Sequence, residues 1–287
     1  MKLGVFMFPT DKAMSPPELA REVEARGFAS LWFPEHSHIP ASRRTPWGGP
    51  QRSDAPPLPE EYWRTHDQFV ALGACAAVTE RIELGTGICL VAQRDPIWLA
   101  KEVASVDVLS GGRLQLGIGY GWNVEEMGHH GVAFGERRAI VREKVLAMKE
   151  LWTQDEASFS GEHVNFEPSW SYPKPIQQPH PPIILGGGGG PKMFDAVVEY
   201  ADGWMPIGGR HEIDGQVEQL RRVAESKGRD PSTIDLGVFM VKPDPAEIER
   251  LAGLGITFGS FPLPPAGRDE VLPLLDRYME LLPAPVG

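Results

Sequence analysis

PIILGGGGGP, residues 182–191, is the stretch of this sequence that decides its fold. Its apolar start predicts a buried strand over Pro182–Leu185, and Pro191 stands where a first-turn proline starts a helix that runs to Tyr200. A strand, bare backbone and a helix N-terminus together favour a bound anion, because N–H groups and the helix dipole point at it. A flexible linker is the alternative interpretation. The structured flanks favour phosphate or another ligand anion, although no nucleotide fingerprint is matched.

The same alternation of strand and helix continues in both directions from this stretch. A first helix is expected after the capping box formed by Ser15 and Glu18. With neither a repeat nor a low-complexity linker, the pattern predicts a single (β/α)8 TIM barrel over residues 1–287, an α/β fold. A doubly wound open sheet is the structural alternative. The expected strands are Lys2–Phe8, Ser30–Phe33, Ile82–Val91, Arg113–Gly119, Pro182–Leu185, Gly203–Ile207, Ile234–Val241 and Ile256–Phe261.

Two segments interrupt the alternation. Residues 37–65 are rich in proline and glycine, and a loop of this length in a compact domain is typical of a lid or binding loop. Residues 156–180 break the pattern again and predict a hairpin or irregular insertion. We therefore expect one barrel domain with a lid-like loop and one insertion.

Composition restricts the partners. Lys and Arg number 28 against 39 Asp and Glu, and the net charge of −11 argues against general binding of nucleic acid or anionic membranes. No signal peptide or membrane span is visible, and Cys75 and Cys89 lie in apolar stretches, as buried free thiols do in a reducing cytoplasm. A cytoplasmic protein is the expectation. An anionic cofactor would need local backbone donors and a few cations.

Four of the expected strand ends carry glycine, histidine or both. Glycine there indicates either that a flat ligand approaches the backbone or that the strands crowd one another, and four together favour a ligand. His36 is the strand-end side chain that titrates near neutrality, so it is a candidate general acid or base, or else a structural histidine. The four ends are Phe33-Pro34-Glu35-His36-Ser37-His38, Gly85-Thr86-Gly87-Ile88, Gly117-Ile118-Gly119-Tyr120-Gly121-Trp122-Asn123 and Gly186–Gly190.

His36 and His38 together also suit a metal-dependent TIM-barrel hydrolase, in which two histidines bind zinc. That function needs further ligands at later strand ends. No histidine follows Leu185, Ile207 or Val241, so we expect no metal site.

At these residues the chain resembles the luciferase-like monooxygenase family, in particular its coenzyme F420-dependent oxidoreductases. The resemblance covers almost the whole length, and the order and spacing of its motifs make it specific. The motifs are Lys2-Leu3-Gly4-Val5, Trp32-Phe33-Pro34-Glu35-His36, Leu84-Gly85-Thr86-Gly87, Leu109-Ser110-Gly111-Gly112-Arg113-Leu114, Leu116-Gly117-Ile118-Gly119, Gly121-Trp122 and Ala201-Asp202-Gly203-Trp204.

The resemblance implies a cofactor at the C-terminal face of the barrel, either FMN or the deazaflavin coenzyme F420. Its ring would lie over the third strand, where family members have a non-prolyl cis peptide that matches Gly87-Ile88. His36 falls on the family's active-site histidine beside the ring. The phosphate would lie on Gly119, Tyr120, Gly121 and Trp122 and on Gly186, Gly187 and Gly188.

Three positions depart from the family's subgroups. Trp122 and Pro40 replace an acidic residue and a tryptophan of F420-dependent sugar-phosphate dehydrogenases, which argues against sugar-phosphate oxidation. Tyr120 replaces the arginine that meets the flavin phosphate in bacterial luciferase, which favours F420 over FMN.

The expected function is therefore hydride transfer between F420 and a small organic substrate, with His36 as the proton carrier. An FMN-dependent monooxygenase is the alternative, and a barrel that binds cofactor without catalysis is another. Trp47, Tyr62 and Trp63 are candidate substrate contacts in the lid-like loop. A homodimer is expected by analogy with relatives.

Overall fold

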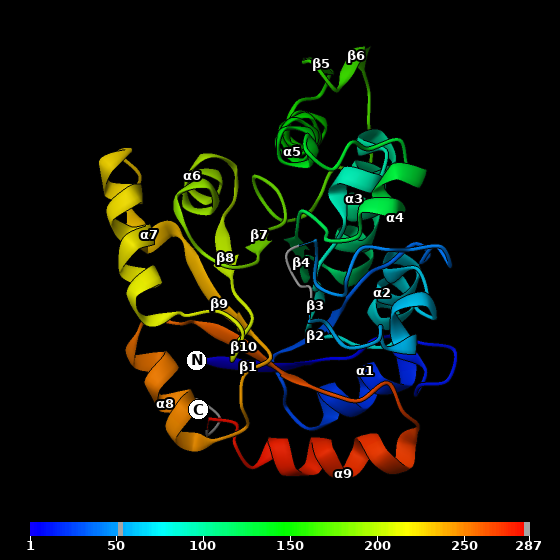
Figure 1. The fold of residues 1–287 in the computed structure, drawn as a ribbon, viewed down its shortest axis with the longest axis vertical. Helices are drawn as coiled ribbons and strands as arrows, with labels where there is room; N and C mark the ends of the chain where they lie inside the picture. Colours follow the sequence, from blue (N-terminus) through cyan, green and yellow to red (C-terminus); the bar gives the residue numbers. More distant parts are fainter. Residues whose placement is uncertain (51–53, 284–287) are drawn as a thin grey trace.

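The structure, a computed structural model, describes residues 1–50 and 54–283. Within these residues eight parallel strands close into a barrel in the circular order β1-β2-β3-β4-β7-β8-β9-β10 (Figure 1), which confirms the TIM barrel and excludes the open sheet. The barrel strands are β1 (Lys2–Phe6), β2 (Ser30–Phe33), β3 (Glu83–Thr86), β4 (Leu114–Ile118), β7 (Ile183–Gly186), β8 (Gly203–Met205), β9 (Asp235–Phe239) and β10 (Phe258–Pro262).

Helices surround the strands, as expected for a parallel barrel. The α-helices are α1 (Pro16–Ala25), α2 (Gln68–Ala76), α3 (Pro96–Ser110), α4 (Val124–His129), α5 (Arg137–Thr153), α6 (Pro191–Tyr200), α7 (Asp214–Ser226), α8 (Pro245–Gly253) and α9 (Arg268–Met279). Short 3-10 helices are η1 (Glu60–Trp63), η2 (Val91–Gln93) and η3 (Pro231–Thr233). No helix of the described residues has the length and apolar character needed to cross a membrane.

The sequence predicts the N-terminal cap of α3 correctly and that of α1 wrongly. The Asp95 carboxylate accepts hydrogen bonds from the backbone N–H groups of Ile97 and Trp98, which fixes the start of α3. The predicted capping box at α1 is wrong, because the Ser15 side chain forms no cap hydrogen bond. Proline at the first two helical positions removes N–H donors there, and Glu18 instead accepts a hydrogen bond from Arg268.

The third strand is shorter than predicted. β3 ends at Thr86, and the chain then leaves the sheet at Gly87-Ile88, touches β4 again only through a bridge at Cys89, and forms η2. The predicted strand over residues 82–91 is wrong after Thr86. A buried loop and a buried strand can show the same hydrophobic pattern, so the sequence does not mark where β3 ends.

The insertion forms a two-stranded antiparallel hairpin of β5 (Ala157–Ser160) and β6 (Asn165–Ser169). The hairpin stands beyond α5 and away from the barrel strands (Figure 1). It therefore takes no part in the strand ends that form the site described below.

A layer of large side chains fills the barrel below its C-terminal face. The Trp32 ring stacks on Phe258 with their centroids 5.8 Å apart, and Phe6 lies 4.1 Å from Phe239. A Cβ atom at Gly85 would lie 2.1 Å from the Trp32 ring, so this glycine makes room for the tryptophan. Of these side chains, Phe6 and Phe239 line the cavity described below.

Candidate active site

A cavity of about 400 Å³ opens at the C-terminal ends of the barrel strands. The loops after β2, β3, β4 and β7 bring the predicted site residues together there. His36 and Trp47 line this cavity, and so does every predicted cofactor contact, namely Gly87, Ile88, Gly119, Tyr120, Gly121, Trp122, Gly186, Gly187 and Gly188.

The structure does not place Trp63 among the residues that line the cavity. Its side chain is 49% exposed, and the preceding residue of η1, Tyr62, faces the cavity instead. Tyr62 packs against Phe8 at 4.8 Å and against Trp47 at 5.7 Å between ring centroids. Burial raises the pKa of the Tyr62 phenol, so it stays neutral at physiological pH.

The peptide bond between Gly87 and Ile88 is cis, as the resemblance implied. The Ile88 side chain lies over two glycines, since added Cβ atoms at Gly119 and Gly186 would be 2.4 and 2.7 Å from it. These two glycines are thus explained by crowding within the protein. Crowding also accounts for Gly87 and Gly121, where an added Cβ would lie 2.6 Å from Phe239 and 2.3 Å from Met127. Strand crowding, the alternative explanation of the strand-end glycines, therefore applies at these positions, and a bound ligand there stays a prediction.

The glycine run after β7 has one free donor in the cavity. Gly187 donates its N–H to the Met205 carbonyl and Gly189 donates to the Gln216 side chain. Among the described residues the N–H of Gly188 has no hydrogen-bond partner, and Gly188 lines the cavity. Gly187 and Gly190 adopt φ angles of 134° and 122°, which favour glycine. The run is structured, so the flexible-linker interpretation is wrong.

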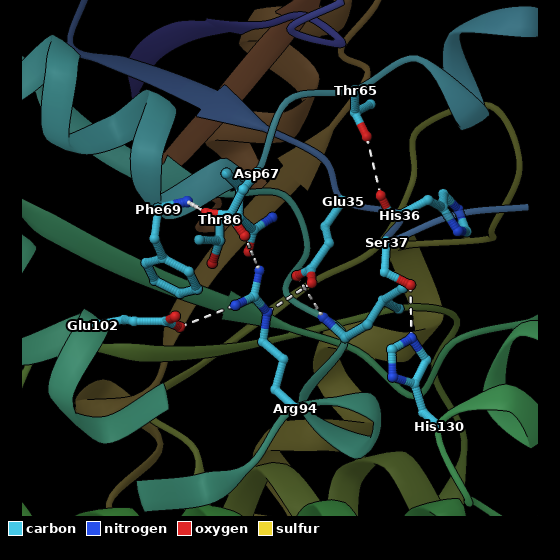
Figure 2. A network of polar contacts seen from close by, with 12 residues as sticks. Glu35, His36, Ser37, Thr65, Asp67, Phe69, Thr86, Arg94, Glu102 and His130 are labelled. Atoms are coloured by element: carbon cyan, nitrogen blue, oxygen red, sulfur yellow. Dashed lines mark hydrogen bonds and ion pairs between the residues drawn. The ribbon is translucent and has the colours of Figure 1, made fainter. Parts of the chain in front are cut away.

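His36 is held by a buried carboxylate. Its Nδ1 atom lies 2.7 Å from Oε2 of Glu126, and the two side chains are 6% and 0% exposed. The indole N–H of Trp122 donates a hydrogen bond of 3.3 Å to Nε2, the other ring nitrogen of His36. The carbonyl of His36 accepts a hydrogen bond from the Thr65 hydroxyl (Figure 2). Hydrogen bonds therefore fix both ring nitrogens of His36 and its backbone carbonyl.

Glu126 was not predicted from the sequence as a site residue. It lies on α4, a six-residue helix capped by Asn123, whose side-chain oxygen accepts the N–H of Glu126 at 3.4 Å. An asparagine with glutamate three residues later has the spacing of a capping box, and this signal predicts the helix start. The spacing alone does not show that the carboxylate turns toward His36.

Glu35 points away from His36 (Figure 2) and belongs to a separate ion network. Its carboxylate accepts hydrogen bonds from Arg94 at 2.7 Å and from the Leu90 N–H at 3.1 Å, and Arg94 also pairs with Asp67 and Glu102. Burial opposes the charge on Arg94, but the carboxylates, Glu35 first, outweigh it and raise the pKa of Arg94. Glu35 thus anchors the loop and adds no unpaired charge to the cavity.

The neighbouring acid of α4 holds the lid-like loop. Glu125 accepts hydrogen bonds from the Thr45 hydroxyl at 2.6 Å and from the N–H groups of Arg44 and Thr45. Burial raises the pKa of Glu125, but these bonds, that from the Thr45 hydroxyl first, outweigh it and lower the pKa to about 2. Trp47 and Gly48 follow directly and line the cavity. Residues 51–53 of the predicted lid lie outside the described residues.

Three arginines of the cavity lining were not predicted. The Arg138 guanidinium lies over the Tyr120 ring, 4.1 Å from its centroid, and Arg137 lies beside it at the N-terminus of α5. Nε of Arg137 is buried without a hydrogen-bond partner, and burial first, then Arg138, lowers the pKa of its guanidinium. Neither forms an ion pair among the described residues. The guanidinium of Arg210 donates to the Gly48 carbonyl at 3.4 Å.

This arrangement fits a bound anion. Two guanidinium groups at the positive end of a helix dipole repel each other and the helix terminus, and an anion relieves both repulsions. The buried Nε of Arg137 is the donor that such an anion would satisfy. The Gly188 N–H and the loop around Tyr120 face the same cavity.

His38 does not join His36. Its Nε2 atom contacts Nδ1 of His129 at 2.8 Å, and its Nδ1 contacts the Ser37 hydroxyl at 3.0 Å. Across the described part of the chain no group of three or more His, Cys, Asp or Glu side chains is placed to hold a metal ion. The hydrolase alternative therefore lacks the ligand set it requires.

The sequence profile of the luciferase-like monooxygenase family matches residues 1–270. The chain belongs to this family. Members of the luciferase-like family are oxidoreductases and monooxygenases, which supports an enzymatic function.

Two curated proteins illustrate the sequence relatives of this luciferase-like protein. An uncharacterized protein of Mycobacterium tuberculosis is 41% identical over 96% of this chain and 97% of its own. The FMNH2-dependent dimethylsulfone monooxygenase of Pseudomonas putida is 30% identical over 64% of this chain and 51% of its own.

Two solved structures share the luciferase-like fold along nearly the whole chain. Monooxygenase RslO1 of Streptomyces bottropensis has a TM-score of 0.76 and 22% identity, and covers 98% of both chains. An F420-dependent secondary alcohol dehydrogenase has a TM-score of 0.75 and 19% identity, and covers 99% of this chain and 98% of its own. At these identities the likeness shows the fold alone.

Proposed function

We propose that this luciferase-like protein is an oxidoreductase that transfers hydride between coenzyme F420 and a small organic substrate. The observation that carries the proposal is His36, which Glu126 holds through Nδ1 and which lines the same cavity as Gly87 and Ile88. Hydride transfer to or from an oxygen-bearing carbon needs a partner for the accompanying proton. An ordered imidazole next to the ring site supplies that partner.

The residues present fit a cofactor with an anionic tail. The ring would lie over Gly87 and Ile88, and the phosphate would lie between the Tyr120 loop and Gly188. Arg137 and Arg138 add the two cations that this acidic chain needs for an anion. The buried Nε of Arg137 supports this placement, because it has no partner within the described protein.

When bound, the cofactor supplies or accepts the hydride. The protein then has three tasks, and each falls to residues described above. His36 would take up or return the substrate's proton at Nε2, and Glu126 fixes the ring through Nδ1. Trp47 and Tyr62 wall the cavity and exclude water, with Glu125 holding the loop that bears Trp47.

A second candidate function is FMN-dependent monooxygenation, and one observation favours it. Position 120 is a tyrosine and not the arginine that meets the flavin phosphate in bacterial luciferase. The guanidinium of Arg138, however, lies over the ring of this tyrosine. Arg138 of α5 therefore supplies a cation near position 120. For this reason the tyrosine at position 120 no longer argues against FMN. The Pseudomonas putida relative, an FMNH2-dependent monooxygenase by name, supports the same alternative.

Titration of the purified protein with F420 and with FMN, followed by quenching of cofactor fluorescence, tests the proposal. Tight binding of F420 supports the F420-dependent oxidoreductase. Binding of FMN alone would move the function to monooxygenation, and binding of neither would overturn both. A parallel titration of R137Q/R138Q shows whether the quenching reports the proposed site, since that variant loses both cations.

We also propose that the protein is a homodimer. The outward faces of α2 and α3 are apolar, with Val70 73%, Trp98 70% and Leu109 68% exposed, and α2 contains no charged residue. Exposed apolar faces of this kind mark interaction surfaces, and a second copy is the partner proposed for this one.

A further inference from the structure

The Tyr62 hydroxyl carries a proton that no described residue accepts. The indole N–H of Trp47 can only donate, so the phenol oxygen of Tyr62 is the acceptor in the hydrogen bond between them. The phenol proton is left without an acceptor among the described residues. Burial raises the pKa of this phenol, so the proton stays on the oxygen at physiological pH. Because Tyr62 lines the cavity, a ligand bound there meets an unused O–H donor.

Aromatic rings fix the position of this donor. The ring centroids of Phe8 and Trp47 lie 4.8 and 5.7 Å from that of Tyr62. The Trp47 ring meets the phenol nearly edge-on, at an interplanar angle of 78°. The His36 ring also lies beside the phenol, at 5.2 Å between centroids. A donor held in this way loses little conformational entropy when it binds a ligand.

Arg210 brings a positive charge close to Tyr62. It follows β8, which stands opposite β2 in the circular order of the barrel, and the loop after β2 carries Trp47, Gly48 and Tyr62. The two loops meet where the Arg210 guanidinium reaches the Gly48 carbonyl at 3.4 Å. Burial has the largest effect on the pKa of Tyr62 and raises it, whereas the charge of Arg210 lowers it. The cation and the unused donor are therefore close together at the mouth of the barrel.

No carboxylate of the described residues forms an ion pair with Arg210. Asp214 and Glu35 are each paired with another arginine. Glu61 acts on the Tyr62 phenol through its charge, but neither Glu61 nor Glu212 lines the cavity. The guanidinium thus adds a positive charge to the cavity lining that the protein itself does not balance.

A carboxylate matches these two donors. Its oxygens can only accept, and hydrogen bonds to an ionised acceptor are stronger than those to a neutral one. One cation balances one negative charge, whereas a phosphate dianion is better matched by the two cations of Arg137 and Arg138. An ammonium group would be repelled by Arg210, and a neutral group would leave its charge unbalanced.

The lining around the two donors is apolar. Phe8, Trp47, Phe239 and Met240 belong to this part of the cavity. A molecule with an aromatic or aliphatic body gains by burying its surface against these side chains.

We infer that the substrate is an apolar or aromatic carboxylate, whose carboxylate group Tyr62 and Arg210 bind together. This inference names the substrate class for the proposed function and rests on that function for the ligand being a substrate. The carboxylate orients the molecule and takes no part in hydride transfer. It also joins the loop after β2 to the loop after β8, since each loop supplies one donor.

Binding of a matched acid and amide to cofactor-free protein tests the substrate class. The probes are 3-phenylpropanoate and 3-phenylpropanamide, titrated by calorimetry in a buffer without phosphate. The indole N–H cross-peak of Trp47, assigned with W47F, is the local reporter. We expect the acid to move this cross-peak and to bind about tenfold more tightly than the amide, because hydrogen bonds to charged groups contribute more than those to neutral groups. Equal binding of the two probes would overturn the inference.

Y62F and R210Q test the two donors separately. Each variant should weaken binding of the acid by about tenfold, the contribution of one hydrogen bond to a charged group. R210Q should also reduce the preference for the acid over the amide, because the amide has no charge to balance. R222Q is the matched control, since it removes the same charge from the surface of α7, and it should leave the affinity unchanged. An acid affinity that survives both Y62F and R210Q would overturn the inference.

R137Q/R138Q separates this site from the arginines proposed for the phosphate. We expect the acid to bind this variant as tightly as it binds wild type. Loss of binding here, with R210Q unaffected, would place the carboxylate at α5 and overturn the inference. None of these measurements needs cofactor. A failure to bind F420 and FMN would therefore overturn the proposed function and leave the carboxylate site standing.

Discussion

The guanidinium of Arg138 lies 4.1 Å from the centre of the Tyr120 ring and joins α5 to the loop after β4. The Tyr120 hydroxyl is in turn fixed by Tyr200 at 2.6 Å, which keeps the ring in place beneath the cation. This stacked pair positions a positive charge at the cavity although the loop itself contributes none. It also makes the N-terminus of α5 part of the cavity wall.

Replacing Arg137 or Arg138 by Gln should weaken cofactor binding by about 10- to 100-fold, since a hydrogen bond to a charged group contributes about 1.5–3 kcal/mol. Fluorescence titration measures the effect. R142Q is the control on the same helix, because Arg142 pairs with Glu199 on the surface. Equal losses in R142Q would show that the charge of α5 as a whole, and not this site, is responsible.

His36→Ala should keep cofactor affinity and lose turnover by about 100-fold or more, because general acid–base catalysis typically contributes about 10²–10⁴. Cofactor bleaching with a panel of small organic compounds gives the rate, and fluorescence titration gives the affinity. His163→Ala, in the hairpin away from the cavity, serves as the control. Unchanged turnover in H36A would remove His36 from the mechanism.

Gly119→Ala should destabilise the fold by about 1–3 kcal/mol, the usual cost of overpacking, because the new Cβ would lie 2.4 Å from Ile88. Ile88→Ala removes the obstacle, so G119A/I88A should be more stable than the sum of the two single changes predicts. Denaturant unfolding measures each free energy. Simple additivity would mean that the glycine serves another purpose.

Glu125→Gln should lower the free energy of unfolding at pH 7 and loosen the loop that carries Trp47. The folded pKa of Glu125 is about 2, below its usual value of 4.5. Its stabilisation is therefore present above pH 4.5 and is lost as pH falls toward 2. The difference between wild type and E125Q in urea unfolding should accordingly shrink from pH 7 to pH 3. A difference that stays constant would contradict this assignment.

Trp98→Arg should convert the proposed dimer to monomer, because a charge would then stand in an apolar contact. Sedimentation velocity distinguishes the two states. Met279→Arg is the matched control, since Met279 is 43% exposed on α9. If wild type is already monomeric, the α2–α3 face has another role.

Much of the architecture could be predicted, because eight alternations and the family motifs each point to the barrel. The ends of the strands could not be predicted, since most residues of β3 and of the loop after it are alike buried. Helix α4 was missed because six residues are too few to show a helical period.

Site residues on loops after strands were predictable from position, as His36 and Gly188 show. Glu126 and the arginines were not, because their roles depend on how helices pack against those loops. Trp63 and Tyr62 are neighbours in η1, and only the turn of the chain decides which one faces the cavity.

Ile88 lies against bare backbone at both Gly119 and Gly186, so the barrel side of the pocket has no spare room for a bulkier residue. Evolution of a new specificity on this scaffold is thereby restricted to the opposite side. Trp47 and Tyr62 lie outside the barrel strands, so a laboratory library aimed at new substrates should begin with those two codons.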